Sequence, residues 1–170
     1  MKRFLNIMLA GLMLLSVCGC TSQETVDQVS SNITLPLKIE DIATGLDGLG
    51  YNTVFNSIKN EFMAQKSYQL VLNDNENLSI YVYKNSQKAM EVSSGFSADG
   101  FSYVVKKGEK VIGGACYEWI NPPHFYRIEN VIIFFLGTDK NILSDLESLY
   151  GSQFAGLSAE QFYGFYIEQQ

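Results

Sequence analysis

The sequence contains little of what metal sites require. Its 170 residues include one histidine and three cysteines. Structural zinc sites are built from clusters of cysteine and histidine, and the sequence holds no such cluster. We therefore predict no zinc site.

Motifs of well-known catalytic and ligand-binding sites are also missing. No serine stands in a G-x-S-x-G turn, no H-E-x-x-H pair occurs, and no glycine-rich segment continues into G-K-S/T. The acidic turn NDNENL lacks the glycine and the closing glutamate of an EF-hand loop. The sequence accordingly predicts no catalytic residue, no bound metal and no cofactor.

Positive charge is scarce. Lysine and arginine together number 12 against 18 aspartates and glutamates, which gives a net charge of −6. No single segment forms a basic patch or a basic amphipathic helix. Because an acidic chain repels nucleic acid and anionic lipid headgroups, we exclude nucleic acid as a partner and expect membrane attachment only through a lipid.

A hydrophobic run long enough to span a bilayer is missing as well. Lys2 and Arg3 precede an apolar segment from Phe4 to Val17, which is 14 residues long. A spanning helix needs about 20 apolar residues. A positive start followed by a short apolar run is typical of a secretory signal.

The signal ends in Val17-Cys18-Gly19-Cys20, which resembles the lipobox of bacterial lipoproteins. The resemblance implies that residues 1–19 are removed as a signal peptide and that Cys20 carries two or three acyl chains. Several chains anchor a protein stably where one is marginal. The expected location is the extracytoplasmic face of the cell membrane. The alternatives are an ordinary signal cut nearby, which leaves Cys20 free, or an uncut amphiphilic anchor.

Processing of this kind changes charge and cysteine content. Removal of residues 1–19 takes away Lys2 and Arg3, so the net charge becomes −6 − 2 = −8. Cys116 is then the only unmodified cysteine, and no internal disulfide can form. Because Cys116 lies in the apolar stretch VIGGACYEWI, we predict that its thiol is buried and inert.

The remaining sequence predicts one small α+β domain. Residues 20–35 are rich in Ser, Thr and Gln and form the expected flexible tether after the lipidated cysteine. Residues 36–156 form the expected domain, a mostly antiparallel sheet of four to six strands with about three helices packed on it. Residues 157–170 form an aromatic tail, expected as a short helix or as a loose contact segment.

Helices are predicted where apolar residues recur at helical spacing. The expected segments are 39–49, 54–62, a short helix that begins at Ser86 as its N-cap, and a helix capped by Thr138 or Asp139 and closed by Gly151.

Strands are predicted from runs of β-branched and aromatic residues. The expected segments are the hairpin 68–72 and 78–83, a second hairpin around KKGE, the segment 117–120, and the run 131–136. Because 131–136 is apolar at every position, we expect it to be a central strand buried on both faces.

The segment from Pro123 to Gly156 resembles a group of small uncharacterised lipoproteins of Gram-positive bacteria. It has their Pro-His-Phe-Tyr start, apolar strand ending in glycine, helix, and closing Gln-Phe-Ala-Gly, and the earlier LSIYVYKNSQKAM resembles another of their segments. The residues after Gly156 depart from that pattern. The resemblance implies a lipoprotein of this architecture and brings no activity with it.

A candidate binding surface consists of Trp119, His124, Phe125 and Tyr126. Aromatic side chains of this kind suit contact with a ligand or a protein, because they offer large area at low entropic cost. Packing in the core is the alternative for these rings. His124 could serve as a base oriented by Glu118, but a hydrogen bond that fixes the start of a strand explains it better.

We therefore expect a membrane-anchored accessory or binding module for a protein, a peptide or a small ligand, and not an enzyme. A binding module should show an open aromatic groove around Trp119 and His124. The alternatives are a structural or envelope-stress lipoprotein without a ligand, and a small hydrolase that uses His124.

Overall fold

The computed structural model describes residues 36–58 and 66–167. The predicted signal peptide, the lipidation site Cys20 and the predicted tether to residue 35 lie outside the described residues. The described residues belong to one compact unit, and their fold is α+β, as predicted.

Six strands form one antiparallel sheet in the order β1-β2-β3-β7-β6-β8. Their bounds are β1 Thr53–Ile58, β2 Lys66–Leu72, β3 Glu76–Val82, β6 Pro123–Ile128, β7 Val131–Leu136 and β8 Ala155–Gly156. A separate two-stranded hairpin consists of β4 Ser102–Lys107 and β5 Lys110–Cys116. The helices are α1 Ile39–Asp47, α2 Ser86–Ser93, α3 Lys140–Tyr150 and α4 Ala159–Ile167.

Helices α1 and α3 pack against one face of the sheet. Their buried residues are Ile39, Ile42, Ala43 and Leu46 on α1 and Ile142 and Leu146 on α3. These residues form one cluster with alternate residues of β2, β3 and β7, because side chains along a strand alternate between the two faces. The two helices also touch each other, since the hydroxyl of Tyr150 donates to the carbonyl oxygen of Ile42 at 3.3 Å.

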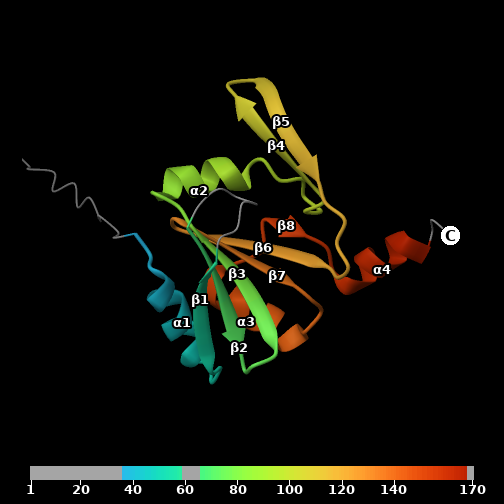
Figure 1. Cartoon of the computed structure of the whole chain (residues 1–170). Helices are drawn as coiled ribbons and strands as arrows, with labels where there is room; N and C mark the ends of the chain where they lie inside the picture. The colour runs from blue at the N-terminus through green and yellow to red at the C-terminus, as the bar shows by residue number, and fades with distance from the viewer. Residues whose placement is uncertain (1–35, 59–65, 168–170) are drawn as a thin grey trace, which may run out of the picture. The chain divides into compact units, whose positions relative to one another are not determined.

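The opposite face of the sheet is covered by α2 (Figure 1). Aromatic side chains pack on the same face. Its cluster includes Tyr81 of β3, Ile132 of β7 and Phe125 of β6, with Ala89 and Val92 supplied by α2. The sheet therefore separates two cores, and the face on which a residue of β6 lies decides which core it joins.

Strand β7 is central, as predicted. It pairs with β3 on one side and with β6 on the other. Val131, Ile132 and Ile133 have no exposed surface. A strand flanked by two neighbours and covered on both faces requires the uninterrupted apolar run that the sequence has.

Two sequence-based predictions of secondary structure were wrong. Residues 53–58 form the edge strand β1 and not a helix, and residues 59–62 lie outside the described residues. The apolar spacing of Phe55 and Ile58 imitates a helix, but pairing with β2 along the whole of β1 satisfies the backbone groups on one side of the strand. Residues 117–120 form no strand, and the strand next to β7 is Pro123–Ile128.

The helix ends follow the capping rules. Asp139 caps α3 through its carboxylate, which accepts from the backbone N–H groups of Asn141 and Ile142, and Gly151 follows its last residue with a φ of +81°. For α2 the prediction was off by one residue, since the cap is Asn85 and not Ser86. The tail contains helix α4, whose Phe162 is buried.

Candidate functional site

The structure divides the four predicted surface residues between the two cores. His124 pairs with Phe135 and Tyr126 pairs with Ile133, which places both on the face covered by α3. Phe125 lies on the opposite face, and the half-buried Trp119 packs there on Phe134, with 5.1 Å between ring centroids. The expectation of one open groove was therefore wrong, because the sheet lies between Trp119 and His124.

Three of these four side chains are core residues. The exposed fractions of His124, Phe125 and Tyr126 are 3 %, 0 % and 3 %. Trp119 is held by a hydrogen bond of 3.0 Å from its Nε1 to the carbonyl oxygen of Gly100. Packing in the core, the alternative for these rings, describes them better than a contact surface does.

Both ring nitrogens of His124 are engaged. Nδ1 lies 2.7 Å from Oε1 of Gln153, and Nε2 lies 3.0 Å from the carbonyl oxygen of Gly137. The ring thus joins β6, the residue after β7 and the segment after α3. A hydrogen bond that fixes the start of this strand is what the sequence favoured for His124.

The environment of His124 favours the neutral ring. Burial lowers its pKa, while the hydrogen bonds to Gln153 and Gly137 act in the opposite direction. In the neutral form Nε2–H donates to the Gly137 carbonyl, and Nδ1 accepts from the Gln153 amide once that amide is turned by half a rotation. Neither nitrogen is then free to take a proton from a substrate, and Glu118 is not among the hydrogen-bond partners of the ring.

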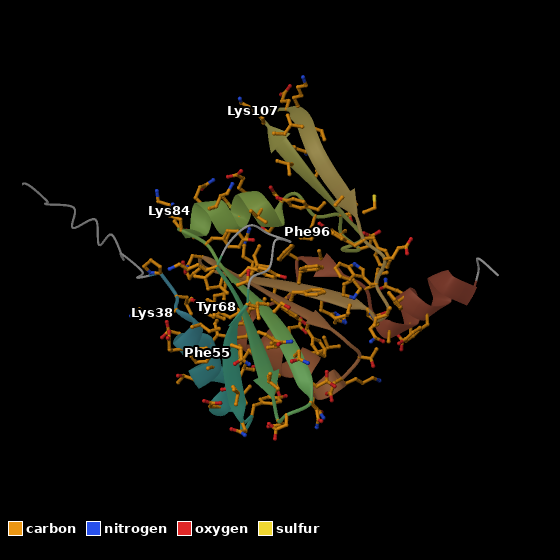
Figure 2. The ribbon with its side chains drawn as sticks, viewed as in Figure 1. Lys38, Phe55, Tyr68, Lys84, Phe96 and Lys107 are labelled. Carbon is orange, nitrogen blue, oxygen red and sulfur yellow. The ribbon has the colours of Figure 1, made fainter. Side chains whose placement is uncertain are left out.

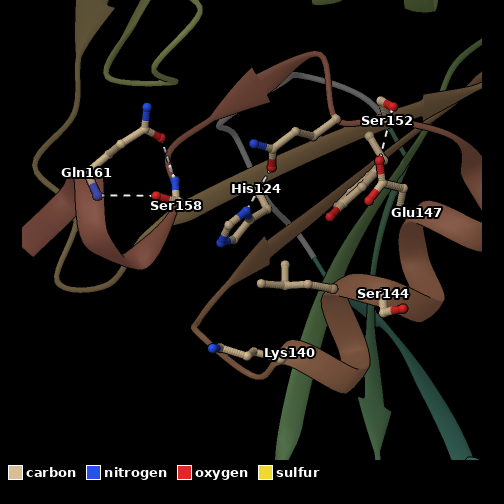
Figure 3. A pocket seen from close by; sticks show the side chains of 10 residues that line it. His124, Lys140, Ser144, Glu147, Ser152, Ser158 and Gln161 are labelled. Atoms are coloured by element: carbon tan, nitrogen blue, oxygen red, sulfur yellow. Dashed lines mark hydrogen bonds between the residues drawn. The ribbon is translucent and has the colours of Figure 1, made fainter.

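A hollow of about 440 Å³, with Tyr126 and Leu143 among its walls, lies beside His124 (Figure 3). We define it by His124, Lys140, Glu147, Ser152, Gln153, Ser158 and Gln161. Most of its polar groups already have partners. The hydroxyl of Ser152 donates to Glu147 at 3.1 Å, and Ser158 and Gln161 cap the start of α4 reciprocally. These bonds give the hollow a structural role at the joint between α3 and α4.

The β4–β5 hairpin is the most exposed element of secondary structure among the described residues. Every residue of β5 is exposed, and Figure 1 shows the hairpin apart from the six-stranded sheet. Val105, Val111 and Ile112 have 40 %, 53 % and 56 % of their surface exposed. Apolar side chains in this position face solvent, although their sequence is typical of buried strands.

The base of the hairpin is held firmly. Val104 N–H donates to the carbonyl oxygen of Gly95 at 2.9 Å. The ring of Phe96 packs at a tilt against those of Tyr103 and Phe125, with centroid distances of 4.9 and 4.7 Å. A Cβ on Gly95 would lie 2.5 Å from the carbonyl oxygen of Val104, so only glycine permits this approach. The hairpin is therefore fixed at one end to the core under α2.

Lysines surround the tip of the hairpin. Gly108, with a φ of +64°, and Glu109 form the turn, and Lys106, Lys107 and Lys110 flank it. A register shift between Val105 and Lys106 leaves Ile112 as the extra residue opposite them. Charged residues and bulges are devices that keep open strand edges from unspecific pairing.

Cys116 ends β5, and the prediction of a buried thiol was wrong. Its side chain is exposed, with Ser102 as its partner across the strands. The apolar neighbours on which the prediction rested are themselves exposed, because the hairpin does not pack on the sheet. The cysteine is accessible to solvent and to reagents.

No protein-family model matches the chain, and comparisons with curated proteins and with solved structures give no match. Within residues 36–58 and 66–167, no helix has both the length and the apolar content needed to cross a membrane. In the same residues no group of three or more His, Cys, Asp or Glu side chains could hold a metal ion.

The sequence analysis predicted the β4–β5 hairpin but did not identify it as an exposed surface. The paired Gly113 and Gly114 and the three lysines around the turn are the signals that could have pointed to it. Glycines without side chains leave a strand little to pack with, and lysines are favoured on open edges.

Proposed function

We propose that this protein is a lipoprotein, anchored through Cys20 on the extracytoplasmic face of the cell membrane, that binds a protein partner through its β4–β5 hairpin. The observation that carries the proposal is the exposure of Val105, Val111 and Ile112 on a hairpin held at its base by the core. The anchor is supported by the lipobox and the apolar run before it.

The hairpin has the physical properties of a contact element. A two-stranded hairpin is marginal by itself, and its outer strand edges present N–H and C=O groups to solvent. A partner strand that pairs with such an edge gains main-chain hydrogen bonds, while its side chains cover the apolar ones. Complete burial of a valine or isoleucine side chain contributes about 1.5–3 kcal/mol, so covering a half-exposed one contributes about 1 kcal/mol. Val111 pairs with Lys106, the neighbour of Val105, so Val105 and Val111 lie on opposite faces of the hairpin, and each face offers its own apolar contact.

Binding accounts for the described residues better than catalysis does. The one histidine of the chain has hydrogen bonds at both nitrogens and 3 % exposure. The hollow beside it contains Ser152 and Ser158. Their hydrogen-bond partners are Glu147 and Gln161 and not His124. A hydrolase that uses His124 would have to break the bonds that join its strands.

Site-specific photo-crosslinking in cells tests the proposal. A photoreactive amino acid is placed at Ile112 of the full chain, and a matched control places it at Ser148, an exposed residue of α3. We expect one discrete protein adduct from position 112 and none from position 148. Equal adduct patterns at both positions, or none from position 112, would refute the hairpin as the contact element.

The anchor has its own test. Intact-mass analysis of the mature protein should show an N-terminal Cys20 with two or three acyl chains. Retention of residues 1–19, or an unmodified Cys20, would refute the anchor and leave the crosslinking result unaffected.

A further inference from the structure

Three lysines from distant parts of the sequence gather around one hollow. The hollow has a volume of about 570 Å³ and is lined by Lys38, Lys66 and Lys84, with Leu37, Val82 and Tyr83 as apolar walls. We call it the lysine hollow. All three lysines are exposed, and among the described residues that line the hollow none is an aspartate or a glutamate.

The fold brings these lysines together by two connections. Lys66, the first residue of β2, lies opposite Val82, the last residue of β3. Lys84 follows Val82 by two residues, so this pairing brings Lys66 and Lys84 to the same end of the two strands. The buried Asn130 supplies the second connection. Its Oδ1 accepts from Leu37 N–H at 2.7 Å and its Nδ2 donates to the Tyr83 carbonyl at 3.1 Å.

Asn130 therefore holds Leu37 beside Tyr83, and the residues that follow these two in sequence are Lys38 and Lys84. Figure 2 shows Lys38 and Lys84 on the side where the described chain begins. Within residues 36–58 and 66–167 the structure has no salt bridge at any of the three ammonium groups, since the one ion pair there joins Lys88 to Glu91. Their charges are available to an anion from outside the domain.

We propose that the lysine hollow binds the anionic phospholipid headgroups of the membrane that holds the anchor, so that this side of the domain faces the bilayer. The inference rests on the proposed anchor at Cys20. Residues 21–35 number fifteen, and a fully extended chain spans at most about 3.3–3.6 Å per residue, so the sixteen steps from Cys20 to Pro36 cover at most about 58 Å. Pro36 itself lines the hollow, so the hollow lies where the described chain begins, at the end of the tether that leads to Cys20.

The acidic net charge of the chain does not oppose this contact. Charges separated by more than about 8 Å are largely screened at physiological ionic strength, so the lysines at the surface decide the local interaction. Phosphate oxygens match the three ammonium groups, and the glycerol and upper acyl carbons of the lipid match the apolar walls. Each basic residue near an anionic bilayer changes the binding equilibrium about fivefold, and three together change it about 100-fold.

The test uses the full lipidated protein, reconstituted into vesicles and followed by amide hydrogen exchange. One set of vesicles contains equal amounts of phosphatidylglycerol and phosphatidylcholine, and the other contains phosphatidylcholine alone. The variant carries Lys38→Gln, Lys66→Gln and Lys84→Gln. A matched control carries Lys106→Gln, Lys107→Gln and Lys110→Gln at the hairpin tip, which removes the same charge elsewhere.

We expect slower exchange around residues 37–40 and 84–86 on the phosphatidylglycerol vesicles only. The equilibrium constant for docking, obtained from this protection, should fall about 100-fold for the variant of the lysine hollow. It should fall by a similar factor for the natural protein in 0.5 M salt. The protection should persist in the tip variant. Equal exchange on both vesicle types, or equal loss in both variants, would overturn the proposal. In a further arm, 10 mM free glycerol phosphate is added to the protein on phosphatidylcholine vesicles. The same protection in this arm would also overturn the proposal, since the hollow would then be a site for small anions.

Flotation of the same vesicles separates this inference from the anchor. A protein that floats with phosphatidylcholine vesicles but shows no lipid-dependent protection has its anchor and lacks the headgroup contact. A protein that does not float lacks the anchor, which would overturn both.

Discussion

We predict that the stability of the domain falls between pH 7.5 and pH 5.5 because of His124. This residue is the one histidine of the chain, and its pKa is lowered because it is buried. The unfolded chain, with a histidine pKa near 6.5, therefore binds a proton in this range that the folded protein does not bind. The stabilisation is fully present above pH 6.5 and is lost as the pH falls toward the lower pKa of the folded state.

The size of the effect has a strict upper limit. One proton changes the free energy of unfolding by at most about 1.4 kcal/mol per pH unit. Between pH 7.5 and pH 5.5 the loss can reach about 1.4 kcal/mol in total, because most of the change begins below pH 6.5. Hydrogen bonds from the hydroxyl of Ser97 and the N–H of Phe101 lower the pKa of Asp99, so this carboxylate does not titrate in this window.

Urea unfolding, followed by the fluorescence of Trp119, measures this dependence. Trp119 is the one tryptophan and packs on Phe134, so its emission reports unfolding of the core under α2. The control is His124→Asn, which should be less stable at every pH and should show no slope between pH 5.5 and pH 7.5. A flat profile for the natural protein, or the same slope in both proteins, would refute the account of His124.

Two further predictions test the packing and the hairpin. Leu146→Ala should lower the free energy of unfolding by about 2–5 kcal/mol, because Leu146 has no exposed surface between α3 and the sheet. The control, Leu149→Ala, should lower it less because the side chain of Leu149 is only half-buried. Equal shifts in the urea midpoint of the two variants would contradict this packing. The exposed thiol of Cys116 should react with a maleimide in the folded protein at a rate within about tenfold of its rate in urea. Peptide mass mapping follows the reaction. A rate in the folded protein that is lower by about 100-fold or more would contradict an exposed hairpin.

The parts of the fold that could be predicted from sequence are those where local pattern and burial agree. Strand β7 was recognised because all six of its residues are apolar, which only a strand buried on both faces tolerates. Helix α3 was recognised from its spacing and from Asp139 and Gly151 at its ends. In both elements the signal lies within the segment itself.

The errors fall where partners distant in sequence decide the structure. Thr53–Ile58 carries helix-like spacing, yet it becomes the edge strand β1 because β2 pairs with it along its whole length. Residues 117–120 have the composition of a strand, yet the strand that pairs with β7 begins at Pro123, because the first residue of a strand tolerates proline and β7 pairs with the whole of β6. No property of either segment alone reveals its neighbour.

The same limit applies more strongly to the proposed contact surfaces. A search along the sequence finds no basic patch because Lys38, Lys66 and Lys84 are far apart, and they meet only after β2 pairs with β3 and Asn130 binds Leu37. The apolar residues Val105, Val111 and Ile112 are of the kind found in core strands, and only the position of the hairpin away from the sheet leaves them exposed. A core is recorded in the periodicity of each segment, whereas a surface depends on which segments the pairing leaves uncovered. For this protein the cores could be predicted largely from the sequence, and the surfaces on which the proposed function depends could not.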